Sequence, residues 1–507
     1  MYQSFIGLEV HIHLLTKTKV FCGCKQAFGE EPNTNVCPVC MGYPGVLPSL
    51  NIEAMRMGCT VARALHCSIP EKTWFERKQY FYPDMPKNYQ ISQFASPLGQ
   101  QGWVDIEGKN RGGSAFKKRV RIKECHLEED AGKMIHTGAA SLLDYNRAGV
   151  SLLEIVTEPD METGEEAEVF IQQLRRLVQY LGVCDGNMEE GSLRADANVS
   201  INLPGKGLGK KVEIKNLNSS RFVRLGLNYE IGRQAEALDA GKTLVQETRL
   251  WNENRDQTEP MRQKENAQDY RYFPEPDLPV FCPDAAFRAS VEAALVEEPV
   301  ARQKRLEADY GLSAEHADLI CEEKALADYF EAAVEAARAS GLDRGEAAAR
   351  IANWLLLDCR HIMHREGIPL DALTGARLPA ERLAALAGLL ARGEVSGKNA
   401  RQALEEALLG KGDPERIIRE RGWSILKDPA AIARTAAGVY EAEKAVFDEA
   451  RALAASAAGA GSEAQAAQKR AKSLRAYLVG KVLAASGGRA DPALAGAEVA
   501  RLLEGSR

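Results

Sequence analysis

The chain is 507 residues long and carries a formal net charge of −6, with the hydrophobic and charged fractions of a globular protein. No apolar run approaches the roughly 18 residues that indicate a membrane span, and the N-terminal residues lack the basic and apolar segments of a secretory leader. The eleven cysteines are an odd number and are unevenly spaced. We therefore expect a reduced, cytoplasmic protein, and neither a membrane protein nor a secreted disulfide framework.

Strand patterns dominate residues 1–292, beginning at residues 7–14. There apolar and polar residues alternate, so that Glu9 and His11 share one face of the predicted strand. Three further predicted strands also place charged or imidazole side chains on one face. The first carries His126 and Glu128, the second Asp196, and the third Glu213 and Lys215. On a single strand, such a face is most simply a solvated surface. Four of them in one sheet indicate a floor that holds a hard cation through oxygen ligands, with Mg²⁺ the favoured ion.

Two close pairs of cysteines flank a short loop, as Cys22-Gly-Cys24 and Cys37-Pro-Val-Cys40. Four thiolates at this spacing are typical of tetrahedral zinc, although the first pair is one residue tighter than usual. Because four protein ligands leave no open coordination position, this zinc is expected to be structural. Four unrelated buried cysteines are the alternative.

Residues 75–93 interleave basic and aromatic side chains, and the prolines within them predict a rigid loop rather than a regular element. Basic side chains in such a segment contact phosphate, and aromatic ones stack on bases. The candidates are Arg77, Lys78 and Lys87 for phosphate and Tyr80, Phe81, Tyr82 and Tyr89 for stacking. A packed aromatic loop with surface lysines is the alternative.

The glycine-rich segment 205–211 is not a phosphate-binding P-loop, because it lacks the required spacing and leads into a strand. We expect a hairpin turn there. A G-x-S-x-G motif is also lacking, so no acyl-enzyme nucleophile is evident. A nucleotide would therefore have to bind through the charged sheet face.

Beyond a proline-rich boundary at 269–279 the composition changes to Ala, Leu, Glu and Arg with helical periodicity. Residues 411–507 carry 16 Lys and Arg against 12 Asp and Glu, so this tail is about +4 and the rest of the chain about −10. The asymmetry is compatible with contact to a polyanion. Residues 454–468, rich in Ala and Gly, are expected to be an insertion that is helical toward its end.

Long stretches of the sequence resemble the B subunits of aspartyl/glutamyl-tRNA(Asn/Gln) amidotransferases, nearly from end to end. The resemblance is carried by residues 6–11, 35–48, 77–84, 88–93, 126–133, 188–194, 215–219 and 269–276. It implies an α+β chain with a strand-rich, cradle-like catalytic domain that includes the zinc knuckle. An all-helical domain and a helical, tRNA-binding tail domain would follow. The implied bounds are 1–293, 294–408 and 409–507.

The resemblance also implies a reaction and partners. In this family, the B subunits work in a heterotrimer with an amidase (the A subunit), which releases ammonia from glutamine, and with a small third protein (the C subunit). The side-chain carboxylate of misacylated Glu-tRNA(Gln) or Asp-tRNA(Asn) is phosphorylated by ATP, and ammonia displaces phosphate to give Gln-tRNA(Gln) or Asn-tRNA(Asn). Phosphoryl transfer needs positioning and charge neutralisation more than a covalent nucleophile. The sequence leaves open which tRNA is used and whether the matching aminoacyl-tRNA synthetase also takes part.

The resemblance implies roles for particular residues of this chain. His11 and Glu128 are expected to bind Mg²⁺ directly. The acidic ring is expected to be completed by Glu9, Glu129, Asp196 and Glu213. The expected contacts to ATP or to the tRNA acceptor end are Lys78, Tyr82, Lys87, Arg147, Lys215 and Asn216. Each of the four carboxylates of the acidic ring, Glu9, Glu129, Asp196 and Glu213, could instead be a structural ion-pair partner.

Two other classes of function would explain part of the pattern. A zinc-ribbon RNA-binding module without catalysis would explain the cysteines and the basic tail, but not the acidic strand faces. A standalone ATP-dependent carboxylate–amine ligase would explain the acidic site, but would not require a tail that reads tRNA. Dependence of ATP hydrolysis on misacylated tRNA separates these classes from the amidotransferase.

Overall fold

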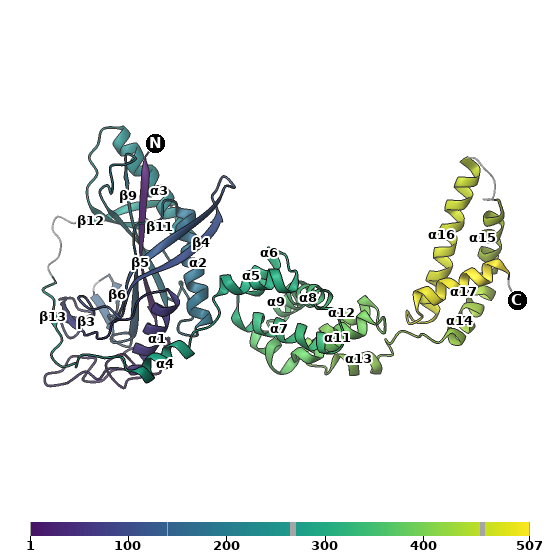
Figure 1. Cartoon of the computed structure of the whole chain (residues 1–507), viewed down its shortest axis with the longest axis horizontal. Helices are drawn as coiled ribbons and strands as arrows, with labels where there is room; N and C mark the ends of the chain where they lie inside the picture. Colours follow the sequence, from purple (N-terminus) through teal and green to yellow (C-terminus); the bar gives the residue numbers. More distant parts are fainter. Residues whose placement is uncertain (1, 139, 264–269, 457–461, 506–507) are drawn as a thin grey trace. The chain divides into compact units, whose positions relative to one another are not determined.

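The computed structural model describes residues 2–138, 140–263, 270–456 and 462–505 (Figure 1). The chain divides into two compact units, Met1–Arg302 and Gln303–Arg507, here called the sheet unit and the helical unit. Strands occur in the first and helices build the second, which confirms the predicted α+β class. Among the described residues, no helix is long and apolar enough to cross a membrane. The finer division into three domains stays a prediction.

An eight-stranded sheet forms the body of the sheet unit. In pairing order its strands are β12 (Gln257–Gln263), β11 (Glu247–Asn252), β10 (Val212–Lys215), β9 (Leu193–Asn202), β1 (Gln3–His13), β8 (Ser151–Thr157), β5 (Ala115–Glu129) and β4 (Gly99–Lys109). Neighbours are antiparallel, except that β10 and β11 are parallel. On β1 the predicted alternation is present, because Leu8, Val10 and Ile12 are fully buried while His11 between them is partly exposed.

Two smaller sheets complete the strand structure. One pairs β13 (Phe273–Pro274), β2 (Glu76–Gln79) and β3 (Tyr89–Ser92), and the other pairs β6 (Lys133–Thr137) with β7 (Ala140–Asp144). The prediction of a loop throughout 75–93 was therefore wrong at its two ends, where antiparallel pairing of β2 with β3 makes short strands. The predicted hairpin at 205–211 is confirmed, since this segment joins β9 to β10, its antiparallel neighbour.

Helices cover the apolar face of the large sheet. Those of the sheet unit are α1 (Ile52–Ala64), α2 (Gly164–Tyr180), α3 (Ser220–Asp239) and α4 (Ala285–Ala293). Helix α2 begins where the side chain of Thr163 accepts a hydrogen bond from the backbone N–H of Glu166, which satisfies one free amide of the first turn. Its Phe170 and Ile171 belong to the same core as Leu8 of β1. The face of the sheet that carries the charged groups is left for a binding site.

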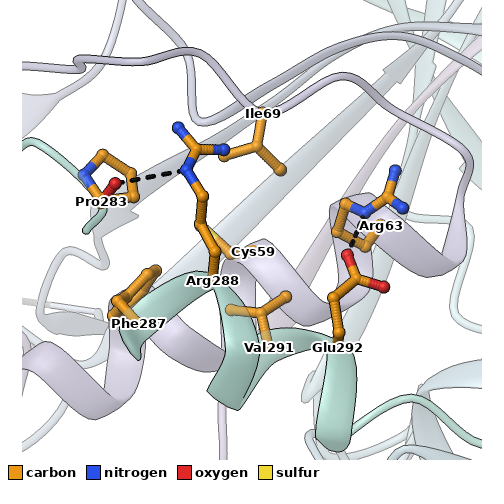
Figure 2. Close-up of a pocket in the computed structure, with 8 residues that line it drawn as sticks. All are labelled: Cys59, Arg63, Ile69, Pro283, Phe287, Arg288, Val291 and Glu292. Atoms are coloured by element: carbon orange, nitrogen blue, oxygen red, sulfur yellow. Dashed lines mark hydrogen bonds and ion pairs between the residues drawn. The ribbon is translucent and has the colours of Figure 1, made fainter. Parts of the chain in front are cut away.

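Helix α4 packs beside α1 next to a small cavity of about 190 Å³ (Figure 2). The guanidinium of Arg288 donates hydrogen bonds to the carbonyl oxygens of Pro283 and Pro70, and Arg63 forms an ion pair with Glu292. Both arginines are thus engaged by groups of the chain itself. These contacts anchor α4 and the segment that leads into it.

The described residues of the helical unit form two separate hydrophobic cores. The first is built around α5 (Pro299–Tyr310), α6 (Ala314–Ile320), α7 (Lys324–Ala339), α8 (Arg344–Asn353), α9 (Arg360–Glu366), α10 (Leu370–Ala372), α11 (Ala380–Ala391), α12 (Gly397–Leu408), α13 (Pro414–Glu420) and the π-helical segments Trp354–Cys359 and Leu373–Arg377. The second is built around α14 (Pro429–Ala442), α15 (Lys444–Ser456), α16 (Ser462–Ala485) and α17 (Pro492–Glu504). Of the predicted insertion, residues 457–461 lie outside the described residues, and helix begins again at Ser462.

Gly102 of β4 tests how closely α1 packs on the sheet. A Cβ atom at this position would overlap the carbonyl oxygen of Leu65 and lie 2.5 Å from Sγ of Cys67. Gly102→Ala should therefore lower the free energy of unfolding by about 1–3 kcal/mol. Gly112→Ala is the control, because a Cβ atom there meets nothing within 4 Å. The measurement is urea unfolding of the full chain, and equal midpoints for the two variants would contradict this packing.

Candidate active site and metal centres

The register of the large sheet brings three polar side chains into one row. Strand β8 lies between β1 and β5, and Glu154 on β8 is opposite His11 on one side and His126 on the other. Sequence reasoning misses Glu154, because it lies in an otherwise uncharged and mostly apolar strand, Ser151–Thr157. Glu154 is the one charged residue of that strand, and this is the signal by which sequence reasoning could have identified it.

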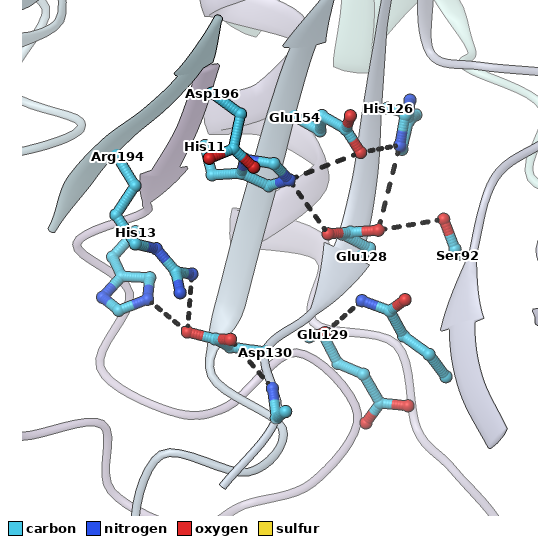
Figure 3. Close-up of polar contacts among 12 residues, drawn as sticks. His11, His13, Ser92, His126, Glu128, Glu129, Asp130, Glu154, Arg194 and Asp196 are labelled. Carbon is cyan, nitrogen blue, oxygen red and sulfur yellow. Dashed lines mark hydrogen bonds and ion pairs between the residues drawn. The ribbon is translucent and has the colours of Figure 1, made fainter. Parts of the chain in front are cut away.

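His11, Glu128 and Glu154 form a cluster suited to a cation, here called the carboxylate cluster (Figure 3). Each offers one ligand atom, and these atoms all lie within 4.8 Å of one another. Nε2 of His11 is 3.5 Å from Oε2 of Glu154 and 3.9 Å from Oε1 of Glu128. The Glu128 side chain is only 4% exposed and accepts a hydrogen bond from Ser92. Two carboxylates and an imidazole are a donor set that fits Mg²⁺ or Mn²⁺.

The electrostatics of the carboxylate cluster also favour a cation. Burial raises the pKa of Glu128, and the neighbouring charge of Glu154 raises it further. Burial opposes ionisation of Glu154 too, but its contacts with His11 and His126 hold the pKa of this carboxyl well below its usual range. For His11, burial lowers the pKa, yet the contact with Glu154 more than offsets this and raises it to about 9. Two buried carboxylates thus compete for nearby positive charge, which a divalent cation would supply.

Three other predicted acidic residues lie outside the carboxylate cluster and have partners of their own. Asp196 forms an ion pair with Lys215, whose Nζ is also 3.1 Å from Glu213. Glu9 accepts a hydrogen bond from the side-chain amide of Asn198 at 2.9 Å. These residues lie to one side of the cluster, on β1, β9 and β10, as part of the same polar sheet face.

Glu129 also has a partner outside the cluster. Its carboxylate forms an ion pair with Lys87 and accepts a hydrogen bond from the backbone N–H of Ile91, and Figure 3 shows it directed away from Glu128. The Lys87 side chain is 9% exposed. The pair therefore joins the β3 region to the end of β5, and both predicted site residues are engaged within the chain.

A cavity of about 400 Å³ is lined by His11 and Glu128 of the carboxylate cluster. Its basic lining consists of Lys78, Arg194 and Lys215. The ammonium of Lys78 is 5.0 Å from the ring centroid of Tyr270. The cavity lining thus carries both carboxylates, which can hold a cation, and basic groups, which can meet phosphate oxygens, as a metal-bound phosphate requires.

The remaining predicted contacts divide between this cavity and its surroundings. Asn216 lines it beside Lys215. Tyr82 is 47% exposed in the loop between β2 and β3. Arg147 lines a neighbouring cavity of about 740 Å³ and donates hydrogen bonds to the carbonyl oxygens of Ala131 and Gly132. The structure therefore brings together some of the predicted phosphate contacts and leaves Tyr82 and Arg147 at the edge.

Asp130 forms a second buried charged centre, which sequence reasoning does not single out. Its carboxylate is 2.7 Å from His13, 2.9 Å from Arg194 and 3.5 Å from Arg147. Figure 3 shows His13 and Arg194 converging on it. Burial alone would raise the pKa of Asp130, but the hydrogen bond with His13 and the two guanidinium charges hold it well below its usual range. Arg194 lines the smaller cavity and Arg147 the larger, so Asp130 lies between the two.

The four predicted zinc ligands are brought together. The sulfur atoms of Cys22, Cys24, Cys37 and Cys40 lie within 4.8 Å of one another. Lys19 is fully buried, and its ammonium is 3.7 Å from Sγ of Cys40. A buried ammonium needs a compensating negative charge, which ionised thiolates supply and neutral thiols do not. The cysteine cluster therefore fits a zinc ion.

Asp130→Asn should destabilise the sheet unit by about 1–2 kcal/mol, because charge-assisted hydrogen bonds to a buried carboxylate are lost while two of its partners are partly exposed to solvent. Since the folded pKa of Asp130 is depressed, its contribution is complete above its ordinary pKa of about 3.9 and is lost as the pH falls further. The difference from wild type, measured by urea unfolding, should be constant at neutral pH and shrink in acid. Asp105→Asn, which removes an exposed pair with Arg119, should change little. Equal effects would contradict the role of Asp130.

Comparison with known proteins assigns the chain to a family. Residues 4–288 match the family model described as "GatB/GatE catalytic domain", and residues 328–503 match the model described as "GatB domain". Similar proteins, named as the B subunits of aspartyl/glutamyl-tRNA(Asn/Gln) amidotransferase, occur in Acaryochloris marina (41% identical, covering 99% of this chain and 98% of that protein) and Thermosynechococcus vestitus (42% identical, covering 99% and 96%). As its sequence resemblance predicted, the chain belongs to the family of aspartyl/glutamyl-tRNA(Asn/Gln) amidotransferase B subunits.

Proposed function

We propose that the cavity beside the carboxylate cluster is where ATP activates the side-chain carboxylate of Glu-tRNA(Gln) or Asp-tRNA(Asn) for amidation. The chain is a subunit of a tRNA-dependent amidotransferase, a ligase that makes Gln-tRNA or Asn-tRNA. The observation that carries the proposal is the donor set of His11, Glu128 and Glu154, with Glu128 buried and the other two partly buried, which lies within the match to a catalytic domain model. None of the three is positioned as a nucleophile, which agrees with a phosphoryl-transfer site.

The chemistry needs a site of this kind. Ammonia cannot expel oxide from a carboxylate, so one oxygen of the substrate carboxylate must first attack the γ-phosphorus of ATP, with ADP leaving. Ammonia then adds to the acyl carbon, and the acyl phosphate bond breaks to release inorganic phosphate and the amide. Charge builds on the phosphate oxygens in the first step, and fixed positive groups stabilise it.

Particular side chains of this chain would meet these requirements. We assign His11, Glu128 and Glu154 as the groups that would hold Mg²⁺, which when bound neutralises phosphate charge. Lys78 and Lys215, on the cavity wall, would contact phosphate oxygens. Lys215 already pairs with Asp196 and Glu213, so these carboxylates would orient its ammonium rather than bind the cation.

The remaining parts of the reaction are assigned to partners. As the family resemblance implies, ammonia would come from an amidase partner, with a third, small protein in the complex. The three-domain division at 293 and 408 and the contact of the basic tail with the tRNA body belong to the same proposal.

Glu154→Gln, in the complex of this chain with its amidase partner, should lower ATP-dependent conversion of Glu-tRNA to Gln-tRNA by about 100-fold or more, because charge stabilisation at the phosphates is lost. Glutamine hydrolysis by the partner should remain. Both activities are measured separately, the first by the amino acid released from the tRNA and the second by glutamate formed in the absence of ATP.

Glu124→Gln is the matched control, because Glu124 lies on β5 with Glu128 but its side chain is 25% exposed beside Lys123. It should keep both activities. Loss of conversion in both variants, or in neither, would sink the assignment of Glu154. ATP hydrolysis that does not depend on misacylated tRNA would favour a standalone ligase instead.

We further propose that the cysteine cluster holds one structural zinc ion. Cys37→Ser should remove zinc from the purified chain, measured by elemental analysis, and lower the thermal midpoint of the sheet unit, because the ion ties the two ends of a loop. Cys282→Ser is the control, since Cys282 is exposed and outside the cluster. Zinc content near zero in wild type would contradict the proposal.

A further inference from the structure

We propose that His126 is a positioning residue that fixes the carboxylate of Glu154 for cation binding, an inference that rests on the proposed function of the carboxylate cluster. His126 lies on β5, in the row that runs across β1, β8 and β5. Its Nε2 is 2.8 Å from Oε2 of Glu154, which is closer than His11 at 3.5 Å. The two imidazoles therefore approach the same carboxylate oxygen from opposite sides of β8.

The geometry places His126 beside the ligand set rather than in it. The ligand atoms that lie within 4.8 Å of one another come from His11, Glu128 and Glu154. Figure 3 shows Nε2 of His126 turned toward Glu154, with Glu128 further away at 3.8 Å. A nitrogen that donates its proton to a carboxylate oxygen cannot also donate an electron pair to a cation. The same Oε2 faces His11, so a hydrogen bond from His126 would hold this oxygen beside the ligand atoms of His11 and Glu128.

The other ring nitrogen of His126 has no partner in the part of the fold that the structure describes, so the contact with Glu154 is the polar interaction that positions the ring. Its Nδ1 is buried and has no hydrogen-bond partner among the described residues, while the side chain is 12% exposed. Buried polar atoms of side chains are nearly always paired, and an exception calls for an explanation. The contact with Glu154 supplies one, because the ring is kept where its Nε2 serves the cluster.

Residues that orient a metal ligand typically contribute about 10–100-fold to metal affinity. His126→Leu should therefore weaken Mn²⁺ binding to the complex by that factor, measured by electron paramagnetic resonance. The Mg²⁺ concentration for half-maximal ATP hydrolysis in the presence of Glu-tRNA should rise in parallel. The rate at saturating Mg²⁺ should stay within about threefold of wild type, since the ligands themselves remain. His126→Gln, whose amide N–H can reach Glu154, should recover part of the affinity.

His136→Leu is the control, because His136 lies on β6 and contacts Ser141 at an exposed position; it should leave both quantities unchanged. If His126→Leu does not fold, as judged by circular dichroism, His126→Asn decides, because its shorter amide does not reach Oε2 of Glu154: an unchanged Mn²⁺ affinity in that variant overturns the proposal.

Two further outcomes separate the positioning role of His126 from the proposed function. If Glu154→Gln retains wild-type Mn²⁺ binding, the carboxylate cluster is not the cation site and the proposed function itself fails. If Glu154→Gln loses binding but folded His126→Leu keeps it, only the positioning role is overturned. A lower saturating rate for His126→Leu with unchanged metal affinity also overturns it, because the ring would then act on the substrate.

Discussion

The repulsion between two buried carboxylates, Glu128 and Glu154, is the constraint on which the sheet unit depends. Both side chains are largely withdrawn from water on one face of the sheet, where an unpaired negative charge is costly. His11 and His126 offset part of that cost from the flanking strands. The negative charge that remains on the two carboxylates favours binding of a divalent cation, and the bound cation would in turn bind phosphate.

The neighbouring charged groups keep this site in place without competing for it. The carboxylate charge of Asp130 is already paired with His13, Arg194 and Arg147. Asp130 therefore connects residues that line two cavities and does not act as another cation ligand. The cysteine cluster lies close by, since a Cβ atom on Gly149 would contact Cys40, Lys19 and Glu129 within 4 Å. The cysteine cluster thus lies beside the end of β5, the strand that carries Glu128. Second-layer groups of this kind set the precision of a metal site.

Much of this could be predicted from the sequence, and what could not has a physical reason. Alternation on β1 placed His11 on the polar face, and cysteine spacing predicted the knuckle, because both patterns are local. A lone charge in an apolar strand marks Glu154 as unusual, but its place between His11 and His126 comes from the strand order β1-β8-β5, which the local sequence does not encode. The family resemblance assigns Glu129 to the acidic ring; in the structure its carboxylate pairs with Lys87, since adjacent residues on a strand face opposite sides. The strands within 75–93 were missed since they are short and charged.

The most direct test of the carboxylate cluster as a cation site is the position of Mn²⁺ in crystals of the complex, located by its anomalous scattering. We predict a peak bonded to His11, Glu128 and Glu154, with His126 in contact with Glu154 and not with the ion. A peak bonded instead to Asp196 and Glu213, with none at the carboxylate cluster, would contradict this assignment, because the outer carboxylates would then be the ligands and the buried pair a structural feature of the sheet.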